Sequence, residues 1–253
     1  MKLRELDSYF RGLMDIDELA KIDASLNGVQ VGHLESEINR AAFAVDACME
    51  SVRRAVEAKA DVLFVHHGMF WGPGIPITGV HYDRVAFLVE NRCGLYASHL
   101  PLDRHPEFGN NAGLAAALSI TDQEAFGDYH GVKIGLKGTL NPPLSINEVL
   151  EKLTIDRNTC GAVLPFGKEV NESIGIVSGG ATREINQAVE EGLDLYLTGE
   201  ASHTMYHFCL EESINLIAGG HYQTETVGVK LLADRLTADT GIETVFIDIP
   251  TGL

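Results

Sequence analysis

The stretch Ala55-Val-Glu-Ala-Lys-Ala-Asp61-Val-Leu-Phe-Val65 decides how this chain is expected to fold. It ends a segment of helical periodicity and passes, through Asp61, into a continuous apolar strand of the kind buried on both faces of a largely parallel sheet. A second stretch, Ala188-Val-Glu-Glu-Gly-Leu-Asp194-Leu-Tyr-Leu-Thr198, lines up with it residue for residue. We interpret the pair as an internal duplication of an α/β unit.

Strands and helices alternate around both stretches. In the first half, strands are expected over residues 41–45, 61–65 and 94–97, and helices over 49–59, 82–91 and 111–118, the last capped by Asn110. In the second half, strands are expected over 174–177, 193–197 and 215–218, and helices over 181–191, 203–212 and 225–236. The predicted fold class is α/β, with two intertwined, duplicated repeats whose mixed sheets are flanked by helices.

We expect the first repeat over residues 1–125 and the second over 126–253, with the C-terminal part of the second packing on the first. Residues 121–173, between the two sets of matching strands, contain Asn141-Pro-Pro143 and shorter β-like runs. This composition suits an elaboration or crossover rather than a flexible linker. A repeat of roughly 125 residues is long enough to bury a core of its own.

Composition excludes several classes of protein. The 253 residues are 45% hydrophobic and 22% charged, which is typical of globular proteins, and the net charge of −17 disfavours a nucleic-acid backbone binder or a polybasic membrane-surface protein. The first residues carry no apolar leader, and no apolar run approaches the roughly 20 residues of a membrane span, so we expect a cytoplasmic protein. The four cysteines are dispersed, which predicts reduced thiols and no cysteine zinc site.

Metal-competent side chains gather where the strands are expected to end, the edge at which open α/β sheets bind ligands. They are His66, His67, His99 and Asp103 in the first half, and Glu200, His203, His221 and Glu225 in the second. Imidazole and carboxylate groups without cysteine suit Zn, Fe, Mn or Ni, and they build dinuclear hydrolytic sites. These residues therefore favour a metal site.

The His66-His67 doublet bears on the number of ions. Adjacent residues on an extended segment point in opposite directions, so one metal cannot easily take both imidazoles. Two neighbouring metals could, with Asp103 and Glu225 as bridging carboxylates. Glu225 is expected to open a helix, where the helix dipole also favours a carboxylate.

Other polar stretches carry weaker signals. The turn Val177-Ser-Gly-Gly180 could cradle a phosphate, although close packing of a helix on a strand explains it equally well. The stretch Ser25-Leu-Asn27-Gly28 is interpreted as a turn with no chemistry of its own. The remaining histidines need no special role: His33, His81, His105, His130 and His207.

Together these segments resemble the Nif-three-like dinuclear-metal family, the homologues of type 2 GTP cyclohydrolase I, in its compact bacterial form. The resemblance covers almost the whole chain. It is carried by Asp23-Ala-Ser-Leu-Asn-Gly-Val-Gln-Val-Gly32, Val65-His-His-Gly68, His99-Leu-Pro-Leu-Asp103, Thr198-Gly-Glu200 with His203, Gly220-His-Tyr-Gln-Thr-Glu225 and Phe246-Ile-Asp-Ile-Pro250.

The resemblance implies a site, its cofactors and an assembly. The implied metal ligands are His66, His67, Asp103, His221 and Glu225, and the cofactors are two divalent ions (Zn, Fe, Mn or Ni). His99, Glu200 and His203 match positions near the metals, where they are expected to be catalytic, with His99 either a pocket residue or an extra ligand. The family is also similar in forming toroidal homohexamers.

The expected function is a dinuclear metal-dependent hydrolase of the GTP cyclohydrolase type, acting through metal-bound water on a nucleotide-like or other small anionic substrate. With GTP, the attack would fall on the imidazole C8. Two alternatives stay open: a metal-binding protein or metallochaperone without catalysis, and a ring-shaped scaffold associated with nucleic acid. The acidic charge disfavours direct nucleic-acid binding unless the lumen of the ring is locally basic.

Overall fold

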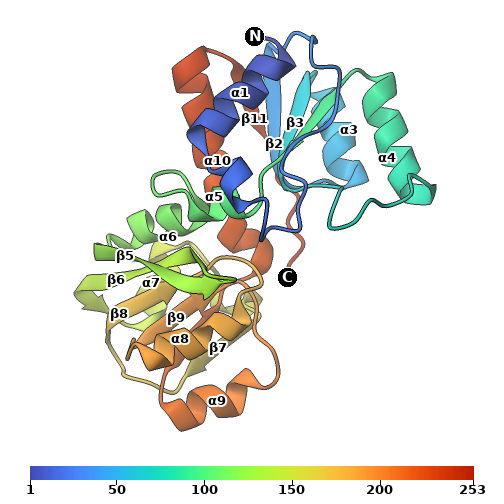
Figure 1. Cartoon of the computed structure of the whole chain (residues 1–253). Helices are drawn as coiled ribbons and strands as arrows, with labels where there is room; N and C mark the ends of the chain where they lie inside the picture. Colours follow the sequence, from blue (N-terminus) through green and yellow to red (C-terminus); the bar gives the residue numbers. More distant parts are fainter. The chain divides into compact units, whose positions relative to one another are not determined.

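The computed structural model describes all 253 residues, which their contacts divide into two units (Figure 1). The first unit comprises Met1–Leu102 and Val229–Ile249, and the second comprises Asp103–Gly228 and Pro250–Leu253. Each unit contains one mixed sheet with helices around it, so the predicted α/β class and its two mixed sheets are confirmed. The boundary expected between residues 125 and 126 falls inside a strand of the second unit.

The first unit is built on a five-stranded sheet in the order β1-β4-β3-β2-β11. The strands are β1 (Gly28–Val31), β2 (Arg40–Asp46), β3 (Val62–His67), β4 (Gly94–Ala97) and β11 (Glu243–Phe246). The helices are α1 (Leu3–Leu13), α2 (Ile16–Leu19), α3 (Met49–Glu57) and α4 (Gly79–Glu90). All neighbouring strands pair in parallel except β1, which runs antiparallel to β4 at one edge.

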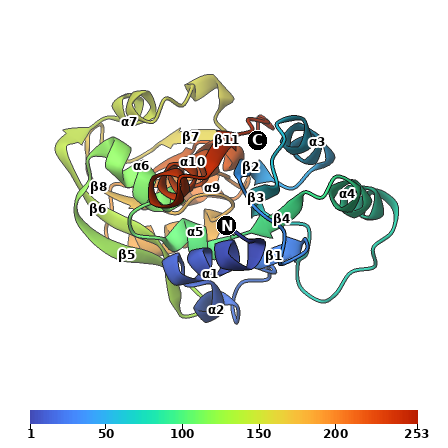
Figure 2. The same cartoon turned by 90° about the horizontal axis from the view of Figure 1, so that it is seen from above.

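Alternation along the strands gives this sheet two different apolar faces. Phe43, Phe64 and Tyr96 share one face, where Phe10 of α1 places its ring centroid 5.1 Å from that of Phe64 and 4.9 Å from that of Tyr96. Smaller side chains form the other face, against Val52 of α3 and other apolar residues of α3 and α4. Helix α1 accordingly lies on one side of the sheet, and α3 and α4 lie on the other (Figure 2).

The second unit is built on a six-stranded sheet in the order β5-β6-β8-β9-β10-β7. The strands are β5 (Thr121–Tyr129), β6 (Val132–Leu144), β7 (Ala162–Pro165), β8 (Asn171–Ile176), β9 (Leu195–Thr198) and β10 (Asn215–Ala218). The helices are α6 (Asn110–Leu118), α7 (Ile146–Lys152), α8 (Ile185–Glu190) and α9 (Met205–Glu212), with short 3-10 turns at Arg157–Thr159 and Thr182–Glu184. Helices α5 (Leu100–Arg104) and α10 (His221–Thr240) contain residues of both units.

The two sheets share a four-strand core with the same pairing. Strands β2, β3 and β4 pair in parallel, as do β8, β9 and β10, and an antiparallel strand closes the edge of each set, β1 in one and β7 in the other. The register is also shared: Ala41 faces Val62 in the first sheet, and Ile174 faces Leu195 in the second. The internal duplication is therefore present in the hydrogen-bond register as well as in the sequence.

In each repeat, an aspartate accepts two backbone hydrogen bonds from the neighbouring strand. Asp61 Oδ2 accepts the backbone N–H groups of Asn39 and Arg40 at 2.7 and 3.0 Å, which fastens the start of β2 to β3. Asp194 Oδ2 accepts the N–H groups of residues 172 and 173 at 2.9 and 3.2 Å, which fastens β8 to β9. Ionised acceptors form strong bonds of this kind, which explains why both repeats carry Asp at the entry to the central strand.

Several helices begin away from the expected residue. Helix α4 begins at Gly79 instead of 82, α8 at Ile185 instead of 181 and α9 at Met205 instead of 203. Two further differences bear on the predicted site. Helix α10 begins at His221 instead of Glu225, so these two residues lie one turn apart on the same face of the helix. Helix α6 begins at Asn110 with Gly109 as its N-cap, and the Asn110 side chain instead donates to Asp103 and accepts from the backbone N–H of Gly228. For Asn110, side-chain contacts with distant segments prevail over the local capping preference.

The residues expected to form an elaboration extend the second sheet. Strands β5 and β6 make an antiparallel hairpin that pairs with β8 through β6.

All four cysteines are free. None of the helices combines the length and the apolar character that crossing a bilayer requires.

The aromatic face of the first sheet allows a direct test of the packing. We expect Phe10→Ala to lower the free energy of unfolding by about 3 to 5 kcal/mol, because a fully buried ring would leave a cavity against Phe64 and Tyr96. Denaturant titration would measure the loss. The control is Glu57→Ala on the exposed side of α3, where the expected change is within about 0.5 kcal/mol; an equal effect of both variants would contradict this packing.

Candidate metal centre

Three histidines of the first unit lie together at the carboxyl ends of β3 and β4. His66 and His67 end β3, and His99 follows β4. One ligand nitrogen from each lies within 4.8 Å of the others. The ring centroids of His66 and His67 are 4.6 Å apart, so the two rings do not diverge as simple strand alternation predicts. They are the last two residues of β3, and both rings lie at this edge of the sheet.

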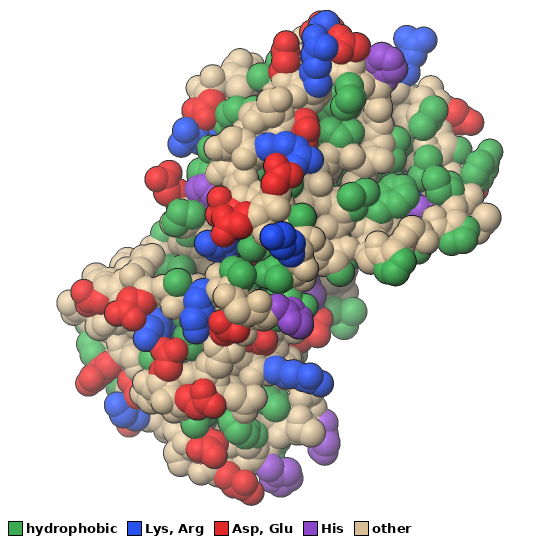
Figure 3. All heavy atoms as spheres, viewed as in Figure 1, with side chains coloured by type: hydrophobic (Ala, Val, Ile, Leu, Met, Phe, Trp, Pro, Cys, Tyr) green, Lys and Arg blue, Asp and Glu red, His purple; other side chains and the backbone are tan.

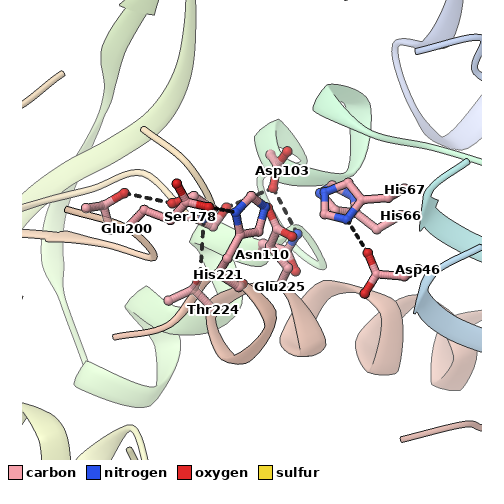
Figure 4. A network of polar contacts seen from close by, with 12 residues as sticks. Asp46, His66, His67, Asp103, Asn110, Ser178, Glu200, His221, Thr224 and Glu225 are labelled. Carbon is pink, nitrogen blue, oxygen red and sulfur yellow. Dashed lines mark hydrogen bonds and ion pairs between the residues drawn. The ribbon is translucent and has the colours of Figure 1, made fainter. Parts of the chain in front are cut away.

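The two rings form hydrogen bonds with segments on either side of β3 in the sheet. His66 is fully buried, and its Nδ1 donates to the carbonyl oxygen of Ser98, beyond β4, at 3.0 Å. His67 Nδ1 lies 2.8 Å from Oδ1 of Asp46, the last residue of β2 (Figure 4). An oxygen acceptor on Nδ1 places the hydrogen there, so the lone pair of each neutral ring is on Nε2.

His99 is held in the same way by a segment near the N-terminus. Its Nδ1 lies 2.9 Å from Asp23 Oδ1, and its backbone N–H donates to Asn27 Oδ1 at 2.9 Å. Burial opposes ionisation of Asp23, but hydrogen bonds from His99, Asn27 and the Ser25 backbone keep the pKa of Asp23 below its usual value. The stretch Ser25–Gly28 was expected to be a turn with no chemistry of its own; its Asn27 supports both Asp23 and the His99 backbone, while the residue that bonds the His99 ring, Asp23, precedes it.

The second unit contributes a set of carboxylates. Asp103 on α5 is 6% exposed, and its Oδ1 accepts hydrogen bonds from Asn110 Nδ2 at 2.9 Å and from Ser178 Oγ at 2.8 Å (Figure 4). A carboxylate oxygen of Asp103 and one of Glu225 lie within 4.8 Å of each other, and Glu225 is 2% exposed. Two buried carboxylates so close together are costly unless a cation or a proton offsets their charge.

His221 supplies an imidazole to this set. Its Nε2 lies 3.2 Å from Glu225 Oε1, and its Nδ1 lies 2.6 Å from Glu200 Oε1. Burial lowers the pKa of His221, but hydrogen bonds and charges from Glu225 and Glu200 outweigh it and raise the pKa to about 9. The imidazolium thus balances these carboxylates as a bound cation would, and a metal ion would have to displace that proton.

The Gly-Gly turn after β8 packs against these ligands. Gly179 has φ +67°, and a Cβ atom there would lie 2.1 Å from Glu225 Oε1. Gly199, after β9, approaches the Gly179 carbonyl and the His221 backbone equally closely, at 2.7 Å for a Cβ atom. Carboxylates beside the turn would repel a phosphate, so close packing is the explanation that the structure favours.

The structure places Glu200 and His203, the other two predicted site residues, differently. Glu200 contacts His221, whereas His203 lies exposed in the turn before α9 and its side chain makes no polar contact. The orienting groups Asp23, Asp46 and Ser178 were not among the predicted site residues. Each had some signal in the sequence: Asp46 ends an apolar strand, Asp23 opens one of the motifs that carry the resemblance, and Ser178 lies in the Val177–Gly180 turn.

The residues fit a divalent metal. All four histidines hold an oxygen acceptor on Nδ1, the arrangement by which proteins orient imidazoles that bind metal through Nε2. The carboxylates of Asp103 and Glu225 add charge that a dication would neutralise. The donor set therefore matches Zn, Fe, Mn or Ni in chemistry.

Comparison with known proteins finds relatives that match nearly the whole chain. A profile of the Duf34/NIF3 (NGG1p interacting factor 3) family matches residues 1–252. The chain belongs to the Duf34/NIF3 family. Two relatives named "GTP cyclohydrolase 1 type 2 homolog", from Treponema pallidum and Archaeoglobus fulgidus, are each 42% identical and cover 100% of both chains.

Several solved structures share the fold of this chain. Protein ybgI, of unknown function, has a TM-score of 0.90 at 32% identity, and a Thermus thermophilus protein has 0.87 at 38%, each over 100% of both chains. Reduced HcgD from Methanocaldococcus jannaschii has a TM-score of 0.83 at 26% identity over 98% of both chains.

The carboxylate behind His67 should tune metal affinity. We expect Asp46→Asn to weaken metal binding by about 10- to 100-fold, because a neutral amide oxygen accepts the Nδ1 hydrogen bond more weakly than a carboxylate and no longer raises the basicity of His67. Competition with a chromophoric chelator would measure the affinity. Asp234→Asn, an exposed carboxylate on α10, is the control and should bind as the wild type does; wild-type affinity in Asp46→Asn would refute the role.

The raised pKa of His221 should appear in the stability of chelator-treated protein. A raised pKa stabilises the fold fully below the unfolded value and loses that effect as pH rises through about 9. His221→Gln should therefore cost more unfolding free energy near pH 6 than near pH 10, by about 1 to 3 kcal/mol. Denaturant titrations at both pH values would measure this difference, and a cost independent of pH would contradict it.

Proposed function

We propose that this protein is a metal-dependent hydrolase that binds two divalent ions through His66, His67, Asp103, His221 and Glu225. The observation that carries the proposal is the shared Nδ1 bonding of the histidines, which prepares Nε2 as a ligand atom. Asp103 follows His99 by only four residues, so the imidazole and carboxylate sets are close neighbours along the chain.

The charges of the ligand set suit such ions. Asp103 and Glu225 are buried with their oxygens close together, and either could bridge two cations, as expected from the sequence. When bound, divalent ions of this kind activate water and polarise the bond to be broken. The protein itself contributes the fixed orientation of the carboxylates, through Asn110 and Ser178 on Asp103.

Three further residues have proposed roles in catalysis. His99 directs Nδ1–H to Asp23, which leaves Nε2 as the atom able to accept a proton beside His66 and His67. Glu200 holds the Nδ1 proton of His221, and its side chain is more than half exposed, so it can exchange protons with solvent. His203 is exposed and is proposed only as a residue that contacts substrate.

The substrate that we propose is nucleotide-like or another small anion. Relatives at about 40% identity carry the name of a GTP cyclohydrolase homologue, which makes GTP the first compound to test, with attack at the imidazole C8. An anionic substrate would complement bound dications. No residue described above selects a purine, so a panel of phosphoesters belongs in the same screen.

We further propose a homohexameric assembly in the cytoplasm. Exposed apolar side chains gather on α4 and on the loop before it, with Ile75, Ile77, Val80 and Tyr82 between 43% and 61% exposed (Figure 3), and contiguous apolar surface supports an interface. The free, dispersed cysteines support a reducing compartment. Acidic and basic side chains alternate on the face shown in Figure 3, which offers no basic stripe to nucleic acid.

Turnover by metal-loaded protein is the test. We expect activity toward at least one member of a nucleotide and phosphoester panel, and a loss of at least about 100-fold in His66→Asn and Glu225→Gln, because each removes a ligand. His130→Asn is the matched control, since this exposed histidine has φ +53°, which Asn adopts readily.

The outcomes separate the hydrolase from its alternatives. Activity that persists in both ligand variants would refute these assignments. Metal binding that both variants lose, without turnover on any panel compound, would favour the metallochaperone or scaffold. A salt-dependent gel shift would favour the nucleic-acid-associated alternative.

A further inference from the structure

A cavity lies in the first unit, at the opposite ends of the strands from the histidine set of His66, His67 and His99. It measures about 560 Å³ and is lined by residues at the amino-terminal ends of β3 and β4. Its apolar wall includes Leu3, Val31, Leu88 and Val89, and its charged groups include Asp61 and Arg92. The volume falls in the range of small-molecule sites, roughly 300 to 1,000 Å³, and its mainly apolar wall with few polar groups is typical of them.

Asp61 is one of the residues that line this cavity. Its Oδ2 accepts the two backbone N–H groups that fasten β2 to β3. Its Oδ1 takes part in neither bond, and the carboxylate forms no ion pair in the structure. The backbone bonds hold the group in one orientation and leave Oδ1 as an acceptor for a donor that enters the cavity.

The second repeat shows which donor fits this position. Asp194 uses Oδ2 for the same two backbone bonds, and its Oδ1 binds the ammonium of Lys168 at 2.7 Å. The smaller cavity beside it, about 210 Å³, is lined by both residues. In the first repeat, Glu35 stands as many residues before the aspartate as Lys168 does, and it binds Lys2 and Arg4 instead. The first repeat therefore has no lysine paired with its aspartate, and its cavity is the larger of the two.

We propose that this cavity binds a small molecule with a primary ammonium on a compact apolar body. The ammonium would occupy the place on Asp61 Oδ1 that Lys168 takes on Asp194, and the apolar body would pack against Val31 and Val89. Two sources share this chemistry: a simple hydrophobic amine, and an apolar amino acid whose carboxylate would pair with Arg92. The site is distinct from the histidine set and does not depend on the proposed hydrolysis.

Calorimetric titration of the full-length, metal-loaded protein tests the proposal with three probes that differ only in their head group. Phenylbutylamine should bind, and phenylbutanol and phenylbutyrate should bind at least about tenfold more weakly, as expected for loss of a charge-assisted hydrogen bond. Phenylalanine distinguishes the two sources. Binding tighter than that of phenylbutylamine, and weakened by Arg92→Gln, identifies an amino acid; weaker binding identifies a simple amine.

Variants locate the site. Asp61→Asn keeps an acceptor for the backbone N–H groups and should remove the preference for the amine over the alcohol. Val89→Trp, at a position 61% exposed on α4, should fill the cavity and abolish binding without disturbing the core. Asp194→Asn is the matched control, because it changes the equivalent aspartate outside this cavity, and it should bind phenylbutylamine as the wild type does.

Three results would overturn the proposal. One is equal affinity for the amine and the alcohol, which would indicate only an apolar surface. Another is a tenfold preference for the amine that survives in both Asp61→Asn and Val89→Trp. The last is binding that appears only when dilution dissociates an oligomer, which would show that a second copy of the chain covers the cavity.

Discussion

Four histidines each hold Nδ1 against an oxygen atom of a neighbouring segment, and the chemistry that we propose depends on this constraint. The acceptors are the carbonyl of Ser98 and the carboxylates of Asp46, Asp23 and Glu200. Asp46 is the last residue of β2, Ser98 directly follows β4, and Glu200 is the second residue after β9, so the ends of parallel strands position three of the four acceptors. In the neutral rings these acceptors favour the tautomer with hydrogen on Nδ1, which leaves Nε2 as the ligand atom that we propose; His221 reaches this state when it gives up its second proton. The fold and the metal chemistry are linked through these bonds.

The duplicated repeats keep one scaffold and use it differently. Their strands share register and an aspartate clamp, yet the first repeat ends its central strand with His66 and His67, where the second has Gly199 and Glu200. One repeat supplies mainly imidazoles, and the other supplies mainly carboxylates with the glycines that make room for them. The opposite ends of the strands have diverged as well, since only in the second repeat does a lysine of the chain form an ion pair with the equivalent aspartate, Lys168 with Asp194.

The sequence allowed the duplicated α/β fold and the location of the metal-competent residues to be predicted, because apolar strands and the residues after them are local signals. Asp23 could not be predicted as the partner of His99, since 76 residues separate them and only the folded chain joins them. The start of α10 was missed for a similar reason: His221 and Glu225 lie on one helical face, but Gly219-Gly220 looked like a longer loop. Polar strands such as β5 lack the apolar run by which a strand is recognised.

The central claim is that His66, His67, Asp103, His221 and Glu225 bind a pair of divalent ions, and elemental analysis of purified protein tests it most directly. Protein prepared without chelator and loaded with Zn, Mn or Fe should retain about two ions per chain after desalting, and His66→Asn and Glu225→Gln should each retain about one or fewer. A wild-type chain that retains no stoichiometric metal, or ligand variants that retain the full content, would contradict the account.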